Sequence, residues 1–95
     1  MIKDDTTVYI PSKTVAYRNI GDSAVIVDIK NNSMIRLNDT GSSIWSLLGE
    51  LSVAQIAAEI HNQFDVTKTQ SLIDTHDFLE FMSKRELVSI SHDND

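Results

Sequence analysis

The sequence contains no cysteine, one proline and three glycines among its 95 residues. The absence of cysteine excludes disulfide bonds, thiolate zinc sites and thiol nucleophiles. Gly21, Gly41 and Gly49 are too scattered to form a loop that cradles phosphate groups, so we expect no nucleotide cofactor. The length and a hydrophobic share of 41% predict one small domain with a single core, covering residues 1–95.

Basic residues are also scarce. Lysines and arginines number 8 against 14 aspartates and glutamates, which gives a net charge of −6 at pH 7. Binding to nucleic-acid phosphates or to an anionic membrane requires an excess of positive charge, so we expect neither as a partner. No apolar run approaches the ~18 residues of a membrane span or the ~7 to 15 of a signal segment. The sequence therefore predicts a cytoplasmic protein without a targeting segment.

Side chains with catalytic or metal-binding chemistry are few. His61, His76 and His92 lack the spacing of metal ligands, because no carboxylate or second histidine completes a motif such as H-E-x-x-H. His76 and Asp77 are adjacent in sequence, but adjacent helical residues do not face each other. No serine lies in a G-x-S-x-G motif. We therefore expect no metal, no cofactor and no enzymatic activity.

The first part of the chain alternates with a period of two, which is typical of β-strands. The alternation covers Val8 to Ile10, residues 24–29, and Met34 to Leu37. Residues 30–33, Lys-Asn-Asn-Ser, predict a tight turn that pairs the last two strands antiparallel, because asparagine tolerates a positive φ. Pro11 is expected to close the first strand.

After these strands the period changes to 3.6 residues, which indicates helices. An apolar stripe that ends at Leu48 predicts a short helix between N-cap candidates at residues 38–40 and Gly49. Ser52 to Gln55 matches a capping box and begins a second helix with a continuous apolar face. Residues 67–70 repeat the capping signal and predict a third helix.

The third helix is expected to end near Lys84, and residues 87–90 alternate again as a possible terminal strand. Three strands followed by three helices predict an α+β fold, with a three-stranded antiparallel sheet and a winged helix-turn-helix arrangement. One sheet edge must stay open. The strand from Met34 to Leu37, guarded only by Arg36, would offer its backbone groups to an incoming peptide.

The third helix has apolar residues over more than the roughly 100° that a core-facing side needs. They are Leu72, Ile73, Phe78, Leu79, Phe81 and Met82. Either the small domain covers this helix on two sides, or part of it lines a binding groove. The carboxylates along it, Asp74, Asp77, Glu80 and Glu86, are either a solvated face or an attraction for a basic peptide.

Residues 37–48, Leu-Asn-Asp-Thr-Gly-Ser-Ser-Ile-Trp-Ser-Leu-Leu, resemble the L-N-x-T-G-x-x-I-W-x-L-L signature of the PqqD family. Residues 52–57 resemble the family's T-x-x-E-I-A second helix, and residues 74–88 its D-V-x-x-F-L-x-x-L-x-x-x-G-L-[IV] close. The resemblance covers about residues 23 to 88. Gln55 stands where glutamate is common, and Glu86 stands where glycine usually precedes the final apolar pair.

The segment from Val8 to Pro11 is more similar to the stand-alone B1 proteins of lasso-peptide biosynthesis. This resemblance implies a RiPP recognition element, a winged-helix domain that binds the leader of a ribosomally made precursor peptide. The leader would join the sheet as an added strand, with an aromatic residue and a proline of a Tyr-x-x-Pro element as anchors. The domain would present the precursor to a leader peptidase or another processing enzyme.

Two sets of residues are the expected leader-binding site. The edge strand contributes Met34, Ile35, Arg36 and Leu37, and one arc of the third helix contributes Leu72, Ile73, His76, Asp77 and Glu80. The motif residues Ile44, Trp45, Leu47 and Ile56 are expected to belong to the core instead.

The sequence leaves two alternatives open. A DNA-binding winged-helix regulator would share the fold, since fold does not determine function. Its recognition helix would carry Asp74, Asp77 and Glu80 toward phosphates, which is the wrong charge. A structural or assembly subunit without a ligand is the third interpretation.

Overall fold

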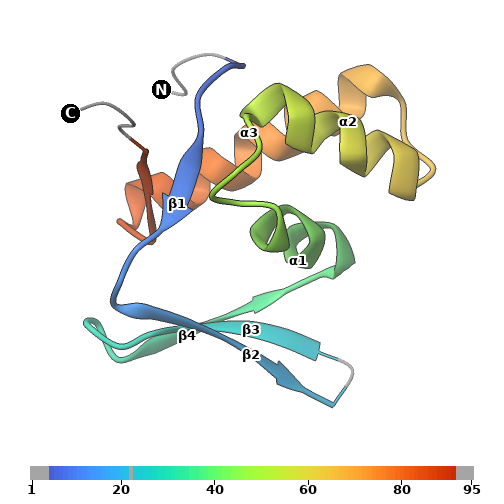
Figure 1. The fold of residues 1–95 in the computed structure, drawn as a ribbon. Helices are drawn as coiled ribbons and strands as arrows, with labels where there is room; N and C mark the ends of the chain where they lie inside the picture. Colours follow the sequence, from blue (N-terminus) through green and yellow to red (C-terminus); the bar gives the residue numbers. More distant parts are fainter. Residues whose placement is uncertain (1–4, 22, 92–95) are drawn as a thin grey trace.

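The computed structural model describes residues 5–21 and 23–91. Its elements are, in order, β1 (Tyr9–Pro11), β2 (Val15–Ile20), β3 (Ser23–Asp28), β4 (Ser33–Leu37), α1 (Asp39–Ser46), α2 (Val53–Gln63), α3 (Lys68–Lys84) and β5 (Val88–Ile90). Figure 1 shows all three helices on one side of the sheet formed by β2, β3 and β4. The predicted α+β class, with a three-stranded antiparallel sheet and three helices, is confirmed.

The three-stranded sheet has the order β2-β3-β4, and both pairings are antiparallel. The turn predicted at residues 30–33 joins β3 and β4, and Asn32 adopts a φ of 54° there. The Asp28 carboxylate accepts hydrogen bonds from the side chain and backbone N–H of Asn31, at 2.8 and 3.3 Å. These bonds fix the hairpin and with it the register of β4.

The place predicted for the first strand is wrong. β1 does not join the three-stranded sheet but pairs antiparallel with β5, with Ile10 opposite Ser89. Figure 1 shows the two strands beside α3, away from the larger sheet. The third member of the sheet is β2, which the sequence pattern did not reveal because Arg18 to Ile20 are all exposed and give no alternation. The predicted terminal strand is confirmed as β5.

The helix boundaries follow the predicted caps. Asn38 Oδ1 accepts the Gly41 N–H at 2.8 Å and begins α1. Ser52 and Gln55 form the predicted capping box, with bonds of 2.9 and 3.3 Å, and begin α2. Thr67 caps α3, which ends at Lys84 as predicted.

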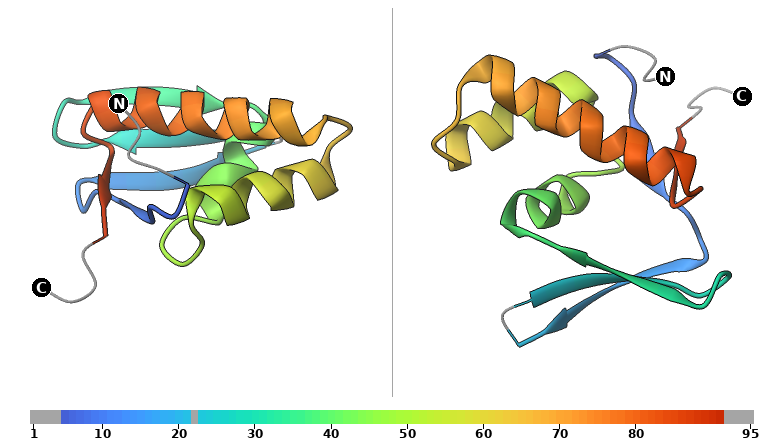
Figure 2. Two further views of the ribbon diagram at one scale, coloured as in Figure 1. Left: turned by 90° about the horizontal axis from the view of Figure 1, so that it is seen from above. Right: turned by 180° about the vertical axis from the view of Figure 1, so that it is seen from behind.

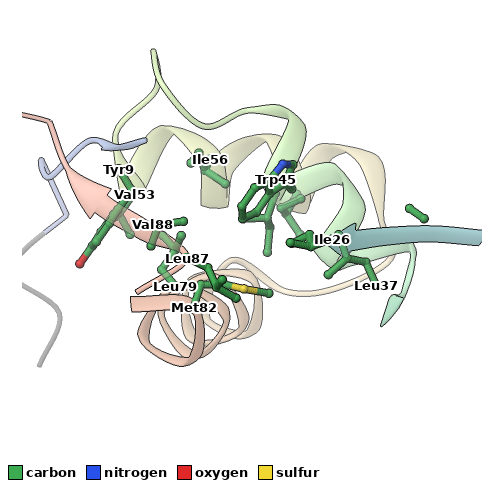
Figure 3. Close-up of a cluster of buried hydrophobic side chains, with 13 residues drawn as sticks. Tyr9, Ile26, Leu37, Trp45, Val53, Ile56, Leu79, Met82, Leu87 and Val88 are labelled. Atoms are coloured by element: carbon green, nitrogen blue, oxygen red, sulfur yellow. The ribbon is translucent and has the colours of Figure 1, made fainter. Parts of the chain in front are cut away.

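The core lies between the helices and the inner face of the sheet (Figure 3). Ile44, Trp45 and Ile56 are buried, as the sequence predicts for these motif residues, and Leu47 is half-buried against them. Burial of such side chains is the main stabilising contribution, at roughly 1.5–3 kcal/mol each.

At the C-terminal end of α3, Glu86 occupies the position after the C-cap, where glycine is the most common residue. Glu86 has a φ of 62°, the left-handed conformation that glycine adopts most easily. Its N–H donates to Ser83 O at 3.0 Å, and the Leu87 N–H donates to Met82 O at 2.9 Å. This pair of bonds is a Schellman motif, which closes the helix and turns the chain toward β5.

Candidate peptide-binding groove

β4 and α3 lie on either side of an open groove, which we call the β4–α3 groove. Its central cavity of about 440 Å³ is lined by Ile35, Leu37, Gly41, Phe78, Phe81 and Met82, among others. Figure 2 shows α3 running along the sheet on the side of β4. The centre of the groove is therefore largely apolar, with two aromatic rings on its helical wall.

The two rings are held differently. An added Cβ at Gly41 would lie 3.0 Å from Phe78 Cε1, so this glycine allows α1 and Phe78 to approach closely. Phe81 is 42% exposed, and the Arg85 guanidinium lies 4.4 Å from its ring centre. An exposed ring stabilised by a neighbouring cation is available for an aromatic or apolar ligand residue.

The orientation of the β4 backbone follows from the register. The Ile29 N–H donates to Thr14 O at 2.9 Å, so the backbone groups of Ile29 point toward β2. Because backbone groups alternate along a strand, those of Asp28 and Ile26 point toward β4. The residue opposite Ile26 is Ile35, and this pair is therefore hydrogen-bonded across the hairpin.

The same alternation orients the remaining residues of β4. Backbone groups of Met34 and Arg36 point away from β3, toward an edge that has no neighbouring strand among the residues described. The side chains of Ile35 and Leu37 face inward, whereas Met34 is 62% exposed and Arg36 is also exposed. An unpaired edge next to an apolar groove is the arrangement that strand addition requires.

Two further cavities extend the β4–α3 groove at its ends. At the β3–β4 turn, a cavity of about 600 Å³ is lined by Ser33 and Met34 together with Lys84 and Arg85. At the other end, a cavity of about 300 Å³ is lined by Asn38 and Thr40 together with Asp74 and Asp77. The groove thus has differently charged ends.

The arc predicted on α3 is only partly the groove wall. Asp77 borders the groove, but Leu72 lines a separate cavity between α2 and α3. His76 Nε2 lies 2.9 Å from Asp5 Oδ1, and Glu80 Oε2 lies 3.6 Å from Lys84 Nζ. The wall is shifted because α3 turns Leu72, His76 and Glu80 toward α2 and the N-terminal segment.

Ile73, the remaining residue of the predicted arc, is 47% exposed. The residues that form the wall instead are Phe78, Phe81 and Met82. Their spacing of three and four positions marked one helix face, but the sequence did not tell which face meets β4. That the four residues of β4 and the five residues of this arc contact a leader peptide remains a prediction.

Glu80 also affects the phenol of Tyr9 in β1. Burial raises the pKa of Tyr9 above its ordinary value of 10.0, and the nearby carboxylate of Glu80 raises it further. The neutral phenol is therefore favoured in the folded protein. This electrostatic interaction links α3 to β1.

The described residues also bear on metal binding and on membrane insertion. Within residues 5–21 and 23–91, no three His, Cys, Asp or Glu side chains come together as metal ligands do. His92, one of the three histidines considered above, lies outside the described residues. No helix in the described part of the chain has the length and apolar character needed to cross a bilayer.

Known proteins share this fold. TbiB1, solved in complex with the TbiA(beta) leader peptide, superposes with a TM-score of 0.77 at 28% identity, over 88% of this chain and 99% of that one. Lasso peptide synthetase B1, complexed with the leader peptide, gives a TM-score of 0.77 at 18% identity, over 85% and 96% of the two chains. The second likeness shows the fold alone.

No curated protein matches the chain at a significant level. The family model described as coenzyme PQQ synthesis protein D (PqqD) matches residues 23–88, which is more than half of the chain. The protein therefore belongs to the PqqD family.

Proposed function

We propose that this protein recognises the leader of a ribosomally synthesised precursor peptide, in the biosynthesis of a lasso peptide. The observation that carries the proposal is the edge of β4 beside the apolar β4–α3 groove, which no strand of residues 5–21 or 23–91 covers. A leader added as a strand would bond to the outward backbone groups of Met34 and Arg36. Its alternate side chains would enter the groove, where Phe78 and Phe81 offer surface to an aromatic or proline anchor.

The relatives support this proposal. TbiB1 was solved with a leader peptide, and it is similar to this chain over most of both lengths. Strand addition alone would not distinguish between sequences, because backbone hydrogen bonds are common to all peptides. We therefore assign selectivity to the apolar centre of the groove.

We further propose that the protein acts by binding, in the cytoplasm, and passes the precursor to a leader peptidase or another processing enzyme. Binding both the precursor and the enzyme would raise the effective concentration of one near the other. A DNA-binding role, the alternative from the sequence, is disfavoured by charge. Asp74 and Asp77 line one end of the groove, where they would repel a phosphate backbone.

The proposal is tested by calorimetry with the leader of the cognate precursor peptide. We expect a dissociation constant between nanomolar and low micromolar, about −8 to −12 kcal/mol. Absence of saturable heat at tens of micromolar leader would overturn the proposal. Binding to the core peptide alone would also contradict it, because recognition would then lie outside the leader.

A second assay tests whether this protein binds the precursor while another enzyme cleaves it. Leader cleavage by the pathway's peptidase should require this protein, and the protein alone should leave the precursor intact. Cleavage or modification by the purified chain without another enzyme would contradict a purely binding role.

A further inference from the structure

The charges at the two ends of the β4–α3 groove differ in sign. Asp74 and Asp77 line the end near α1, and Arg85 lines the end near the β3–β4 turn. Among the described residues, neither Asp77 nor Arg85 forms an ion pair. Both are therefore free to meet a charged ligand residue.

The other charged groups that line the groove differ in their partners, and Arg36 lines its centre without an ion pair among the described residues. Gln70 Nε2 donates to Asp74 Oδ1 at 2.7 Å, which holds this carboxylate in place without neutralising it. At the opposite end, Lys84 is paired with Glu80, and the buried carboxylate of Asp28 accepts from Asn31. Arg85, placed over the Phe81 ring, is thus a cation of this end without a carboxylate partner among the described residues, and Lys84 adds positive charge beside it.

The direction of the added strand relates these ends to the ligand's sequence. β4 runs from Ser33, at the Arg85 end, to Leu37, near the Asp77 end. The sheet is antiparallel throughout, and antiparallel pairing is the more stable kind per residue. A peptide added antiparallel to β4 would enter at Asp77 and leave at Arg85.

The spacing of the charges follows from helix and strand geometry. Asp77 in α3 and Arg85, the C-cap residue of this helix, are eight positions apart, or about 12 Å at 1.5 Å per residue. An extended peptide covers about 3.4 Å per residue, so this span corresponds to about 3.5 residue steps, and four is the nearest even number. Residues n and n+4 of a strand also point to the same face, so both can be directed at the groove.

We infer that the groove selects a leader with a basic residue at position n, an apolar or aromatic residue at n+2 and an acidic residue at n+4. This inference rests on the proposed function, because it concerns the peptide added at the β4 edge. The aromatic residue would lie at the apolar centre, against Phe78 and Phe81. The charges would set the direction of the peptide and weaken binding of the reversed order by repulsion at both ends.

Two synthetic peptides of identical composition test the inference. Both are acetylated, amidated decapeptides with serine flanks, and their centres are Lys-Thr-Tyr-Thr-Glu-Pro and Glu-Thr-Tyr-Thr-Lys-Pro. Each keeps the Tyr-x-x-Pro element, so only the order of charge differs. NMR titration of the whole protein at low salt should show the Lys-first peptide binding about three- to tenfold more tightly. The difference should disappear near 1 M salt, where the Debye length falls to about 3 Å.

A charge-exchanged protein provides the reciprocal test. The double variant Asp77→Lys/Arg85→Glu should prefer the Glu-first peptide by a similar factor, and thermal unfolding checks that it is folded. Glu59→Lys is the control, because it replaces an exposed carboxylate of α2 with a lysine, as Asp77→Lys does in α3. This variant should keep the wild-type preference for the Lys-first peptide.

Equal affinities for the two peptides, or an unchanged preference in the double variant, would overturn the inference and leave the proposed function standing. Failure of both peptides and of the full leader to bind would overturn the proposed function as well.

Discussion

Gly41 in α1 and Phe78 in α3 are in contact at the limit of close packing. A Cβ on Gly41 would lie 3.0 Å from Phe78 Cε1 and 3.2 Å from Asn38 Oδ1. Gly41 is buried, whereas Phe78 is half-buried at the open centre of the groove. Gly41 in α1 therefore helps to set the position of the Phe78 side chain, which α3 contributes to the groove.

Replacing Gly41 with alanine should narrow the β4–α3 groove without unfolding the protein. Alanine favours a helix by about 1 kcal/mol over glycine, which offsets the displacement of the Phe78 ring. A ring forced from its preferred rotamer costs of order 0.5–1.5 kcal/mol, so leader affinity should fall about two- to tenfold. Thermal unfolding and leader calorimetry measure the two effects.

The matched control is Ser46→Ala, an exposed position on the same helix. Its leader affinity should equal that of the wild type. If Gly41→Ala binds the leader as well as Ser46→Ala does, the contact between Gly41 and Phe78 does not shape the groove.

The helices could be predicted because their signals are local. Asn38, Ser52 and Thr67 each cap a helix through a bond to a residue three positions later. The hairpin between β3 and β4 was equally accessible, since Asn32 takes the positive φ that its residue type tolerates. Such features depend on a few neighbouring residues and need no knowledge of tertiary structure.

The errors concern contacts between distant parts of the chain. β1 pairs with β5 across about 80 positions, with Tyr9 opposite Ile90, and no local pattern encodes this partner. In β2, Val15 and Tyr17 pack against the core, but the exposed Ile20 hides the alternation. The apolar residues of α3 are evident from the sequence, but the face that meets β4 depends on how α2 and the N-terminal segment cover the opposite side.

Replacing Glu86 with glycine should stabilise the protein. A left-handed conformation costs a residue with a side chain about 1–2 kcal/mol, and part of this gain is offset by the greater freedom of glycine in the unfolded chain. We expect a net increase of about 0.5–1 kcal/mol in the free energy of unfolding, measured by urea denaturation.

Glu86→Ala is the control, because alanine keeps the Cβ and removes the same charge. The ion pair between Lys30 and Glu86 spans 3.9 Å between exposed side chains, so its loss should change little. A glutamate-to-alanine variant as stable as the glycine variant would mean that charge, and not φ, limits this position.

Because the pKa of Tyr9 is raised in the folded protein, part of the free energy of unfolding is lost at alkaline pH. The folded state favours the neutral phenol, so the contribution is fully present below the ordinary pKa of 10.0. It is lost as the pH rises from there through the raised pKa of the folded state, because the unfolded chain ionises first. The free energy of unfolding should therefore decline above about pH 10 less steeply in Tyr9→Phe than in the wild type.

Urea denaturation between pH 8 and 11 measures this difference. Glu80→Gln should weaken the decline partially, since the carboxylate is the smaller of the two causes. Parallel pH profiles for Tyr9→Phe and the wild type would show that the phenol is not involved.

Strand addition requires the edge of β4 that is unpaired within the described part of the chain, and a pair of proline variants tests that edge. Met34→Pro removes an N–H that points away from β3, whereas Ile35→Pro removes one that faces Ile26 across the hairpin. Ile35→Pro should therefore lose stability through the sheet, and Met34→Pro should remain folded. Met34→Ala is the control for loss of the exposed side chain.

Leader calorimetry on folded Met34→Pro is the most direct measurement. The lost hydrogen bond is worth about 0.5–1.5 kcal/mol, and the proline ring adds a steric block, so we predict at least about tenfold weaker binding than for Met34→Ala. Met34→Pro that melts like the wild type and binds the leader with wild-type affinity would contradict strand addition at β4.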